Sequence, residues 1–318
     1  MDSFIIMLKN VMLFVALAVP GYILVKTKLL KSEQSSGLSS LLTFVGVPFL
    51  VFYSTISSIS FHKKLFGLLL TAAVLFIAFL LVLFFLSKLI VKKSEDEKKR
   101  GMIRFCTVFA NNGFLGIPLS VAVFGESSPV VTALIVMNVL NNIMLYTLGA
   151  YLVSGDKSTM SFKKAFLNPV LIAFLLAVLC NLLDAVSFLP ELATYSKHFN
   201  NTVTPIAMTV LGMKLGDVKL SALFTSWNVY YVSFLKLVAS PVLVVGGLLV
   251  LQLFVPTVDD SMVLATFIAF AMPTASLSSL FADHYGGDTE NAVTFTLGST
   301  VLSVATIPLL YWALTALL

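Results

Sequence analysis

The chain has little charge and few of the residues that build catalytic or metal sites. Only 11% of its 318 residues are Asp, Glu, Lys or Arg, whereas an ordinary soluble protein carries about 25%. Together with 58% hydrophobic residues, this composition excludes a soluble fold. The 20 basic residues outnumber the 15 acidic ones, but no soluble module carries the excess, so we predict no nucleic-acid partner.

Cysteine and histidine are also scarce, which limits the chemistry. Cys106 and Cys180 both lie in apolar segments, which argues against a disulfide framework or a CxxC metal site. His62, His198 and His284 lie at the edges of such segments. Because neither a nucleophile–base pair nor a metal cluster is visible, the sequence predicts no enzyme, no cofactor and no bound metal.

Long apolar stretches make up most of the chain, each about as long as the 20 residues that a helix needs to cross a bilayer. They are residues 4–25, 37–61, 65–91, 105–125, 130–153, 169–189, 199–216, 229–254, 261–282 and 291–317. The sequence therefore predicts an all-α integral membrane protein with ten transmembrane helices and short connections.

Lys and Arg lie mostly in alternate connections, and this pattern sets the predicted orientation. Fifteen of the twenty, Lys214 among them, follow odd-numbered spans and three follow even-numbered ones, while Lys9 and Lys236 lie within spans. Cytoplasmic connections carry the excess of Lys and Arg. We therefore expect a cell-membrane protein with both termini outside and the central connection inside.

Two proline pairs recur at nearly the same spacing. Pro48 and Pro205 are 157 positions apart, and Pro118 and Pro273 are 155 apart. They fall in spans two and seven and in spans four and nine, which predicts two inverted five-helix repeats. The expected units are a first repeat at 1–153, a cytoplasmic linker at 154–168 and a second repeat at 169–318.

The fourth span holds too many helix breakers to continue as a regular helix. Asn111, Asn112, Gly113, Gly116 and Pro118 lie within eight residues. Unwound backbone near the bilayer centre must be buried in protein or line a polar cavity. The ninth span has a similar break, with these residues: Pro273, Thr274 and Ser276.

The two breaks together predict an anion site. If Pro118 and Pro273 each begin a second half-helix, two positive helix ends converge near the midplane. Their free N–H groups, with the amides of Asn111 and Asn112, would suit a carboxylate. The alternative is a pair of proline kinks packed by small residues, with the asparagines bonding between helices.

Other polar residues within spans are open to two interpretations. Asn138, Asn141 and Asn142 share one helical face of the fifth span, where either helix packing or lining of the site would explain them. Lys236 either extends to the cytoplasmic surface or faces the interior and balances a substrate charge.

The segments at 111–119, 272–276, 285–288 and 297–300 together resemble the auxin efflux carrier family in its compact bacterial form. The resemblance covers essentially the whole chain. It implies a secondary carrier similar to bile acid symporters and sodium/proton antiporters, with helices four and nine broken and crossing near the midplane. It also implies an elevator-type movement against a scaffold domain, through which the protein forms a homodimer.

The resemblance further implies organic-anion substrates such as malate, malonate or auxin-like acids. It places the substrate carboxylate at Asn111, Asn112, Pro118 and Pro273. The mid-span carboxylates of the related antiporters are missing here, so a proton and sodium both stay open as coupling ion.

The expected function is therefore a secondary active or facilitative carrier of small carboxylates, with membrane lipid around it. A transport-inactive sensor with the same fold and a channel are the alternatives, in that order. The candidate substrate-binding residues are Asn111, Asn112, Gly113, Gly116, Pro118, Asn138, Asn142, Pro273, Thr274 and Ser276, with Lys236 as a charge-balancing group.

Overall fold

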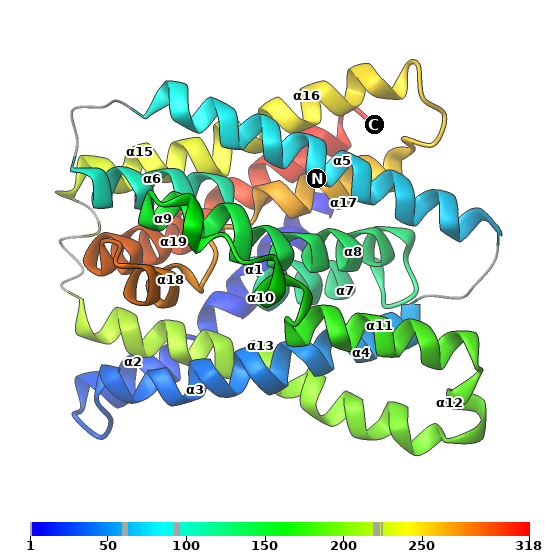
Figure 1. The fold of residues 1–318 in the computed structure, drawn as a ribbon, viewed down its shortest axis with the longest axis horizontal. Helices are drawn as coiled ribbons and strands as arrows, with labels where there is room; N and C mark the ends of the chain where they lie inside the picture. The colour runs from blue at the N-terminus through cyan, green and yellow to red at the C-terminus, as the bar shows by residue number, and fades with distance from the viewer. Residues whose placement is uncertain (1, 59–62, 92–95, 219–222, 224) are drawn as a thin grey trace.

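The computed structural model describes the whole chain except residues 1, 59–62, 92–95, 219–222 and 224. The described part is helical, and its β-structure is limited to one isolated antiparallel bridge between Ala110 and Thr274. Most helices run along the long axis of the molecule (Figure 1).

The longer helices follow one another with short connections. In chain order the helices of seven or more residues are α1 (Asp2–Ala16), α2 (Val19–Lys26), α3 (Ser35–Leu41), α4 (Val47–Ser58), α5 (Lys63–Ile90), α6 (Glu97–Val108), α7 (Ile117–Phe124), α8 (Pro129–Met144), α11 (Pro169–Leu182), α13 (Pro190–Asp217), α15 (Trp227–Phe234), α16 (Ser240–Gln252), α17 (Asp260–Ala271), α18 (Ser278–Tyr285) and α19 (Thr289–Thr315). The short ones are α9 (Ala150–Ser154), α10 (Phe162–Phe166) and α12 (Ala185–Phe188), with 3-10 turns η1 (Ser32–Gln34) and η5 (Lys157–Thr159).

Seven helical stretches in the described chain are long and apolar enough to cross a membrane, as expected of a multi-pass membrane protein. They are Phe4–Lys26, Ser32–Ser58, Phe66–Ile90, Pro129–Ser154, Lys157–Leu182, Trp227–Gln252 and Thr289–Thr315. Each overlaps one of the ten predicted spans.

The other three predicted spans are not continuous apolar helices. Spans four and nine are interrupted, because α6 ends at Val108 and α17 ends at Ala271. Span seven lies within the 28-residue helix α13, whose Asn200, Asn201 and Lys214 make it more polar than the other seven.

Wide π turns precede three of the prolines. They are η2 (Leu42–Gly46), η3 (Asn112–Gly116) and η6 (Leu235–Ala239), which stand just before Pro48, Pro118 and Pro241; a fourth, η4 (Leu145–Gly149), has no proline after it. Proline lacks the N–H that an α-helix needs. In η3, for example, the N–H of Ile117 donates instead to Asn112, five residues back, so a wide turn carries the chain into each proline.

Helices α2 and α13 cross with their backbones in contact. A Cβ atom on Gly21 would lie 1.9 Å from the carbonyl oxygen of Thr209, and one on Gly212 would lie 1.8 Å from that of Ala18. Helix α4 packs against both α13 and α11. We call α2, α4, α11 and α13 the first helix group; it occupies one side of the molecule in Figure 1.

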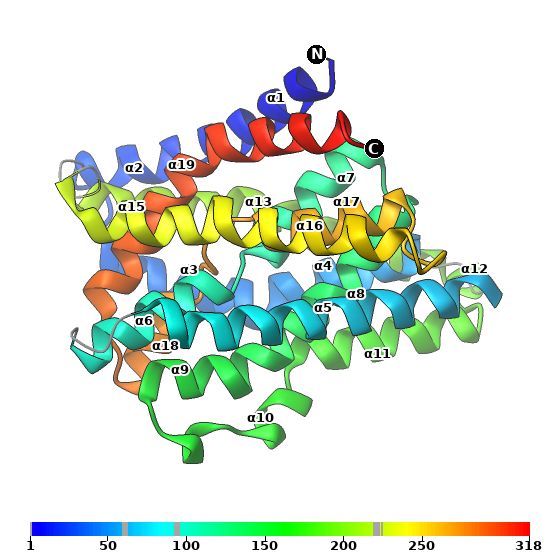
Figure 2. The same ribbon diagram turned by 90° about the horizontal axis from the view of Figure 1, so that it is seen from above.

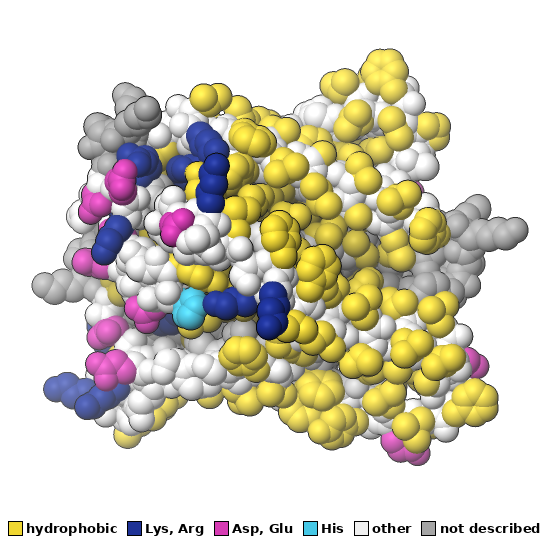
Figure 3. All heavy atoms as spheres, viewed as in Figure 1, with side chains coloured by type: hydrophobic (Ala, Val, Ile, Leu, Met, Phe, Trp, Pro, Cys, Tyr) yellow, Lys and Arg dark blue, Asp and Glu magenta, His cyan; other side chains and the backbone are white. Residues whose placement is uncertain are grey.

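The remaining long helices pack on the other side and around the two interrupted spans. Helix α1 lies beside α19, so the two ends of the chain come near each other (Figure 2). Figure 3 shows that Lys, Arg, Asp and Glu side chains on the visible face gather at one end of the molecule, over α6, α9 and α18. We call this the charged end; most of the remaining visible face is hydrophobic.

Candidate functional site

Two extended segments pass each other antiparallel in the interior, between the end of α6 and the end of α17. The N–H of Asn111 donates to the carbonyl of Pro273 at 2.8 Å, and the N–H of Ala275 donates to the carbonyl of Phe109 at 3.1 Å. We call these segments, residues 109–111 and 273–275, the crossover. They bring the two predicted breaks into direct contact.

Proline sets the geometry of the second segment. Met272 has φ −62° and ψ 148°, because the ring of Pro273 disfavours the α region for the residue before it. Pro273 therefore ends α17, and the next helix, α18, begins only at Ser278. The prediction that Pro273 begins a half-helix is wrong, since residues 273–275 pair with the other segment instead.

The first break is shorter than predicted. Helical structure resumes at Asn112 with the π turn η3, and Pro118 occupies the second position of α7. Pro118 thus comes six residues after the helical start rather than at it. The asparagines, not the proline, stand where the second half-helix begins.

Side chains from neighbouring helices hold the crossover in place. The hydroxyl of Thr274 donates to the carbonyl of Cys106 at 3.0 Å, and the N–H of Thr274 donates to Ser299 Oγ on α19 at 3.2 Å. On α8, Asn141 Nδ2 donates to the carbonyl of Ala110 at 3.3 Å. Such bonds satisfy backbone groups that the interrupted helices leave free. Thr274 therefore stabilises the crossover. Asn141 and Ser299 do so as well, although sequence reasoning did not select them as site residues.

A small cavity of about 30 Å³ lies beside the crossover and holds roughly two water-sized groups. Polar side chains from the first break, from α8 and from the segment before α18 line it: Asn111, Asn112, Asn138, Asn141, Asn142 and Ser276. We call it the crossover cavity. The asparagine face of α8, which the sequence left open between packing and site lining, does both.

Two amides in this cavity lack partners among the described residues. Asn112 has a fully buried side chain whose oxygen and nitrogen both have no hydrogen-bond partner there, and the same holds for the nitrogen of Asn138. The others are bonded: Asn111 Nδ2 donates to Ser276 Oγ at 2.8 Å, and Asn142 Nδ2 to the carbonyl of Asn138 at 2.9 Å. A buried amide without a partner costs about 1–3 kcal/mol.

The two glycines of the break allow close packing around the crossover. Gly113 lines the cavity, and a Cβ atom on it would lie 3.4 Å from Asn138 Oδ1. Gly116 does not line it, and a Cβ atom there would lie 3.3 Å from Met272 Cγ. Pro118 does not line the crossover cavity but faces a different one. Pro273 contributes its carbonyl to the crossover and does not line the cavity either.

Lys236 faces the interior of the protein. It lies in η6, which packs against α6, α17 and α19, and its side chain is fully buried. Its ammonium nitrogen has no hydrogen-bond partner among the residues the structure describes. The alternative that it extends to the surface is therefore excluded, although it does not line the crossover cavity.

Larger cavities open toward both ends of the molecule. One of about 510 Å³ lies at the charged end, and its ionisable lining residues are Glu33, Lys164, Lys214, Asp217, Asp283 and His284. The other, about 350 Å³, is lined at its polar side by Tyr53, Ser58, Glu126, Asn200 and Asn201, and also by Pro118. We call them the charged-end cavity and the far-end cavity.

Lys214 is placed differently from the prediction. Sequence reasoning assigned it to a connection, but it lies inside α13, three residues before the helix ends at Asp217. Its Nζ donates to Ser279 Oγ on α18 at 2.7 Å. The apolar run of the seventh predicted span ends near Lys214, which is why the sequence suggested a connection there. The sequence alone does not show in which direction the side chain points.

Among the described residues, no group of three or more His, Cys, Asp or Glu side chains is placed to hold a metal ion. The chemistry of the crossover cavity is that of neutral amides and a hydroxyl. Such groups donate to and accept from a bound molecule without changing their charge.

Comparison with known proteins identifies the family of this chain. The sequence model of a family described as "Membrane transport protein" matches residues 5–161 and again residues 156–311. A protein of Methanothermobacter thermautotrophicus, described as an uncharacterized transporter, is 26% identical over 308 residues, covering 95% of this chain and 96% of the relative. The chain therefore belongs to this membrane transport protein family, the auxin efflux carrier family that its broken helices resemble.

Proposed function

We propose that the protein carries small organic anions, mono- or dicarboxylates such as malate, malonate or auxin-like acids, across the cell membrane. The observation that carries this proposal is the buried amide of Asn112, which lines the crossover cavity without a protein partner. An ionised carboxylate only accepts hydrogen bonds, whereas the nitrogens of Asn112 and Asn138 only donate them. The carboxylate and these amide nitrogens are therefore complementary in hydrogen bonding.

The size of the crossover cavity limits what it can hold. About 30 Å³ suits the head group of an acid rather than a whole dicarboxylate. The rest of the substrate would extend into the neighbouring space beyond Ser276. A site of this kind selects for the carboxylate, while the remainder of the substrate contacts the walls of the larger cavities.

The fold we propose has ten spans in two inverted repeats, at 1–153 and 169–318. Three observations support it: the family model matches each half separately, the two interrupted spans meet at the crossover, and the proline pairs recur at one spacing. Seven continuous stretches, the two interrupted spans and α13 together supply the ten.

Transport by this fold requires the crossover to be exposed to each side in turn. The charged-end and far-end cavities lie on either side of it and suit such alternation. We propose an elevator-type motion in which the crossover and the helices around it move against the first helix group. The backbone contacts at Gly21 and Gly212 hold α2 and α13 of that group together. We propose the group as the scaffold, through which a homodimer would form.

Lys236 fits this proposal as a balancing charge. Its turn η6 packs against both α6 and α17. A buried ammonium there would offset the charge of a bound anion. Orientation follows the positive-inside rule, with the charged end in the cytoplasm and both termini outside.

A ligand screen tests the proposed function. Purified protein in detergent is heated with malate, malonate, lactate, citrate or indole-3-acetate, and a ligand that binds the folded state raises the apparent unfolding temperature. The proposal expects at least one acid to do so, and neutral analogues such as malonamide not to. A folded protein that responds to none of the acids contradicts it.

Uptake by proteoliposomes separates a carrier from its alternatives. A sensor would bind the acid without moving it, and a channel would conduct far faster than a carrier. Replacing sodium by choline, and separately collapsing the pH gradient, identifies the coupling ion by the loss of concentrative uptake.

A further inference from the structure

A third cavity connects the charged-end cavity to the crossover cavity. It has a volume of about 40 Å³ and lies between α13, α18 and α19. It shares Ser39, Lys214 and Ser279 with the charged-end cavity, and Phe114, Ser276 and Leu277 with the crossover cavity. We call it the neck, because a molecule moving between those two cavities would pass through it.

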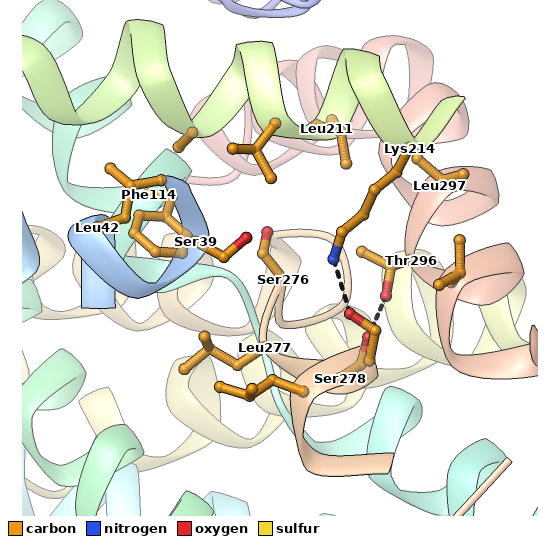
Figure 4. Close-up of a pocket in the computed structure, with 15 residues that line it drawn as sticks. Ser39, Leu42, Phe114, Leu211, Lys214, Ser276, Leu277, Ser278, Thr296 and Leu297 are labelled. Atoms are coloured by element: carbon orange, nitrogen blue, oxygen red, sulfur yellow. Dashed lines mark hydrogen bonds between the residues drawn. The ribbon is translucent and has the colours of Figure 1, made fainter. Parts of the chain in front are cut away.

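One cation faces the neck. Figure 4 shows the Lys214 side chain extending from α13 into the cavity, toward α18 and beside Ser276 and Ser278. Its ammonium donates to Ser279 Oγ at 2.7 Å. An ammonium has three donors, so two remain for another acceptor.

The carboxylates nearby do not neutralise this lysine. Asp217 and Asp283 line the charged-end cavity but not the neck. Within the described part of the chain, no acidic oxygen lies within 4 Å of Lys214, the distance of an ion pair. Asp283 acts on Lys214 only from beyond that distance, so the neck carries a positive charge that no close ion pair neutralises.

The other polar groups of the neck are hydroxyls. Ser278 and Thr296 bond to each other at 2.6 Å, and Ser276 accepts from Asn111. Ser276 thus stands in both the neck and the crossover cavity. Neutral hydroxyls with a single cation, inside mostly apolar walls, favour an anion over a cation.

We propose that Lys214 forms an anion-binding site in the neck, where it receives the carboxylate of the substrate on its way between the charged-end cavity and Asn112. The site rests on the proposed carrier function for the identity of its ligand. The positive charge of the neck itself does not depend on that function.

The first test measures the charge in the neck without any substrate. Cysteine replaces Ser39, which lines the neck and bonds only within its own helix, to the carbonyl of Ser35, and Cys180 is replaced by serine. A negatively charged methanethiosulfonate should then react faster than a positively charged one, by about tenfold. Lys214→Gln should remove this preference, and Lys214→Arg should keep it.

A matched control uses the exposed Lys164, which lines the charged-end cavity but not the neck. Lys164→Gln should leave most of the preference for the negative reagent. If Lys214→Gln leaves the ratio of the two rates unchanged, or if Lys164→Gln abolishes it equally, the neck is not the site.

The second test measures the affinity for malate and malonate. Lys214→Gln should weaken it by about tenfold or more, as expected for the loss of a charged hydrogen bond. If the wild-type protein binds none of the acids of the ligand screen, the proposed function fails and the substrate role of Lys214 falls with it. If the wild type binds and Lys214→Gln binds equally well, only the Lys214 site is overturned.

Discussion

The N–H of Asn111 and the carbonyl of Pro273 are joined by a 2.8 Å hydrogen bond, although the two residues come from opposite halves of the chain. The bond fixes Asn111 by its backbone, and the side chain of Asn111 is fixed in turn by Ser276. Its neighbour Asn112 has no such restraint among the described residues. The side chains of these adjacent asparagines thus differ: one is bonded across the crossover, and the other has both polar atoms without a partner among the described residues.

Asn112→Ala should leave the ligand-free protein as stable as the wild type or more so, because it removes a buried amide without a protein partner. It should at the same time abolish the rise in unfolding temperature that a bound carboxylate causes. Thermal unfolding with and without malonate measures both effects.

Asn111→Ala is the matched comparison. It breaks the bond to Ser276 and should lower stability by about 1 kcal/mol. A loss of stability in Asn112→Ala as large as that in Asn111→Ala would mean that Asn112 has a structural role instead.

The contact of α2 with α13 predicts a large effect of a single methyl group. A Cβ atom on Gly212 would lie 1.8 Å from a backbone oxygen, so Gly212→Ala forces the helices apart and should destabilise the protein by several kcal/mol. Monodisperse yield after gel filtration in detergent measures the effect.

Gly246→Ala in α16 serves as the control, because nothing lies within 4 Å of its Cβ position. Alanine in a helix interior is favoured over glycine by about 0.5–1 kcal/mol, so this variant should be recovered at least as well as the wild type. Equal losses in both variants would contradict the close packing.

The supporting hydroxyl of Thr274 can be removed with little change of shape. Thr274→Val leaves the carbonyl of Cys106 without its 3.0 Å donor in a buried place and should cost about 1–3 kcal/mol. Thr294→Val, which removes an exposed hydroxyl that bonds within its own helix, should have little effect. Chemical or thermal unfolding of the two variants side by side decides the point.

The proposed charge of Lys236 predicts a trade-off between stability and transport. Lys236→Met removes a fully buried ammonium, so the apparent unfolding temperature should hold or rise. Uptake should fall by about tenfold, since the bound anion loses a balancing charge. Lys9→Met, at an exposed site in α1, should change neither the unfolding temperature nor uptake. Full uptake by Lys236→Met would refute the proposed role of Lys236 as a balancing charge.

Sequence reasoning located the breaks because their residues act locally. Asn111, Gly113 and Gly116 cannot continue a regular helix, and proline restricts the residue before it, so the places where spans four and nine stop were predictable. The conformation of the chain after each break was not predictable. Residues 273–275 stay extended because they pair with a segment from the other half of the chain, which no local pattern reports.

The same limit explains the residues that the sequence placed wrongly or omitted. Lys214 ends an apolar run, which is typical of a connection, and only its hydrogen bond to Ser279 on α18 shows that the side chain turns inward. Ser299 and Asn141 are polar residues within apolar helices, and each has other polar residues near it in the sequence. Their partners are backbone groups of the crossover, which exist only once that crossover has formed.

The crossover also constrains how the protein is made. The N–H of Asn111 and the carbonyl of Phe109 come from the first half, and their partners, Pro273 and Ala275, are translated much later. An unpaired backbone group in hydrocarbon costs several kcal/mol, so the segment after α6 reaches its final paired form only once the segment after α17 has been made. The crossover is therefore completed late, when most of the chain has already been translated.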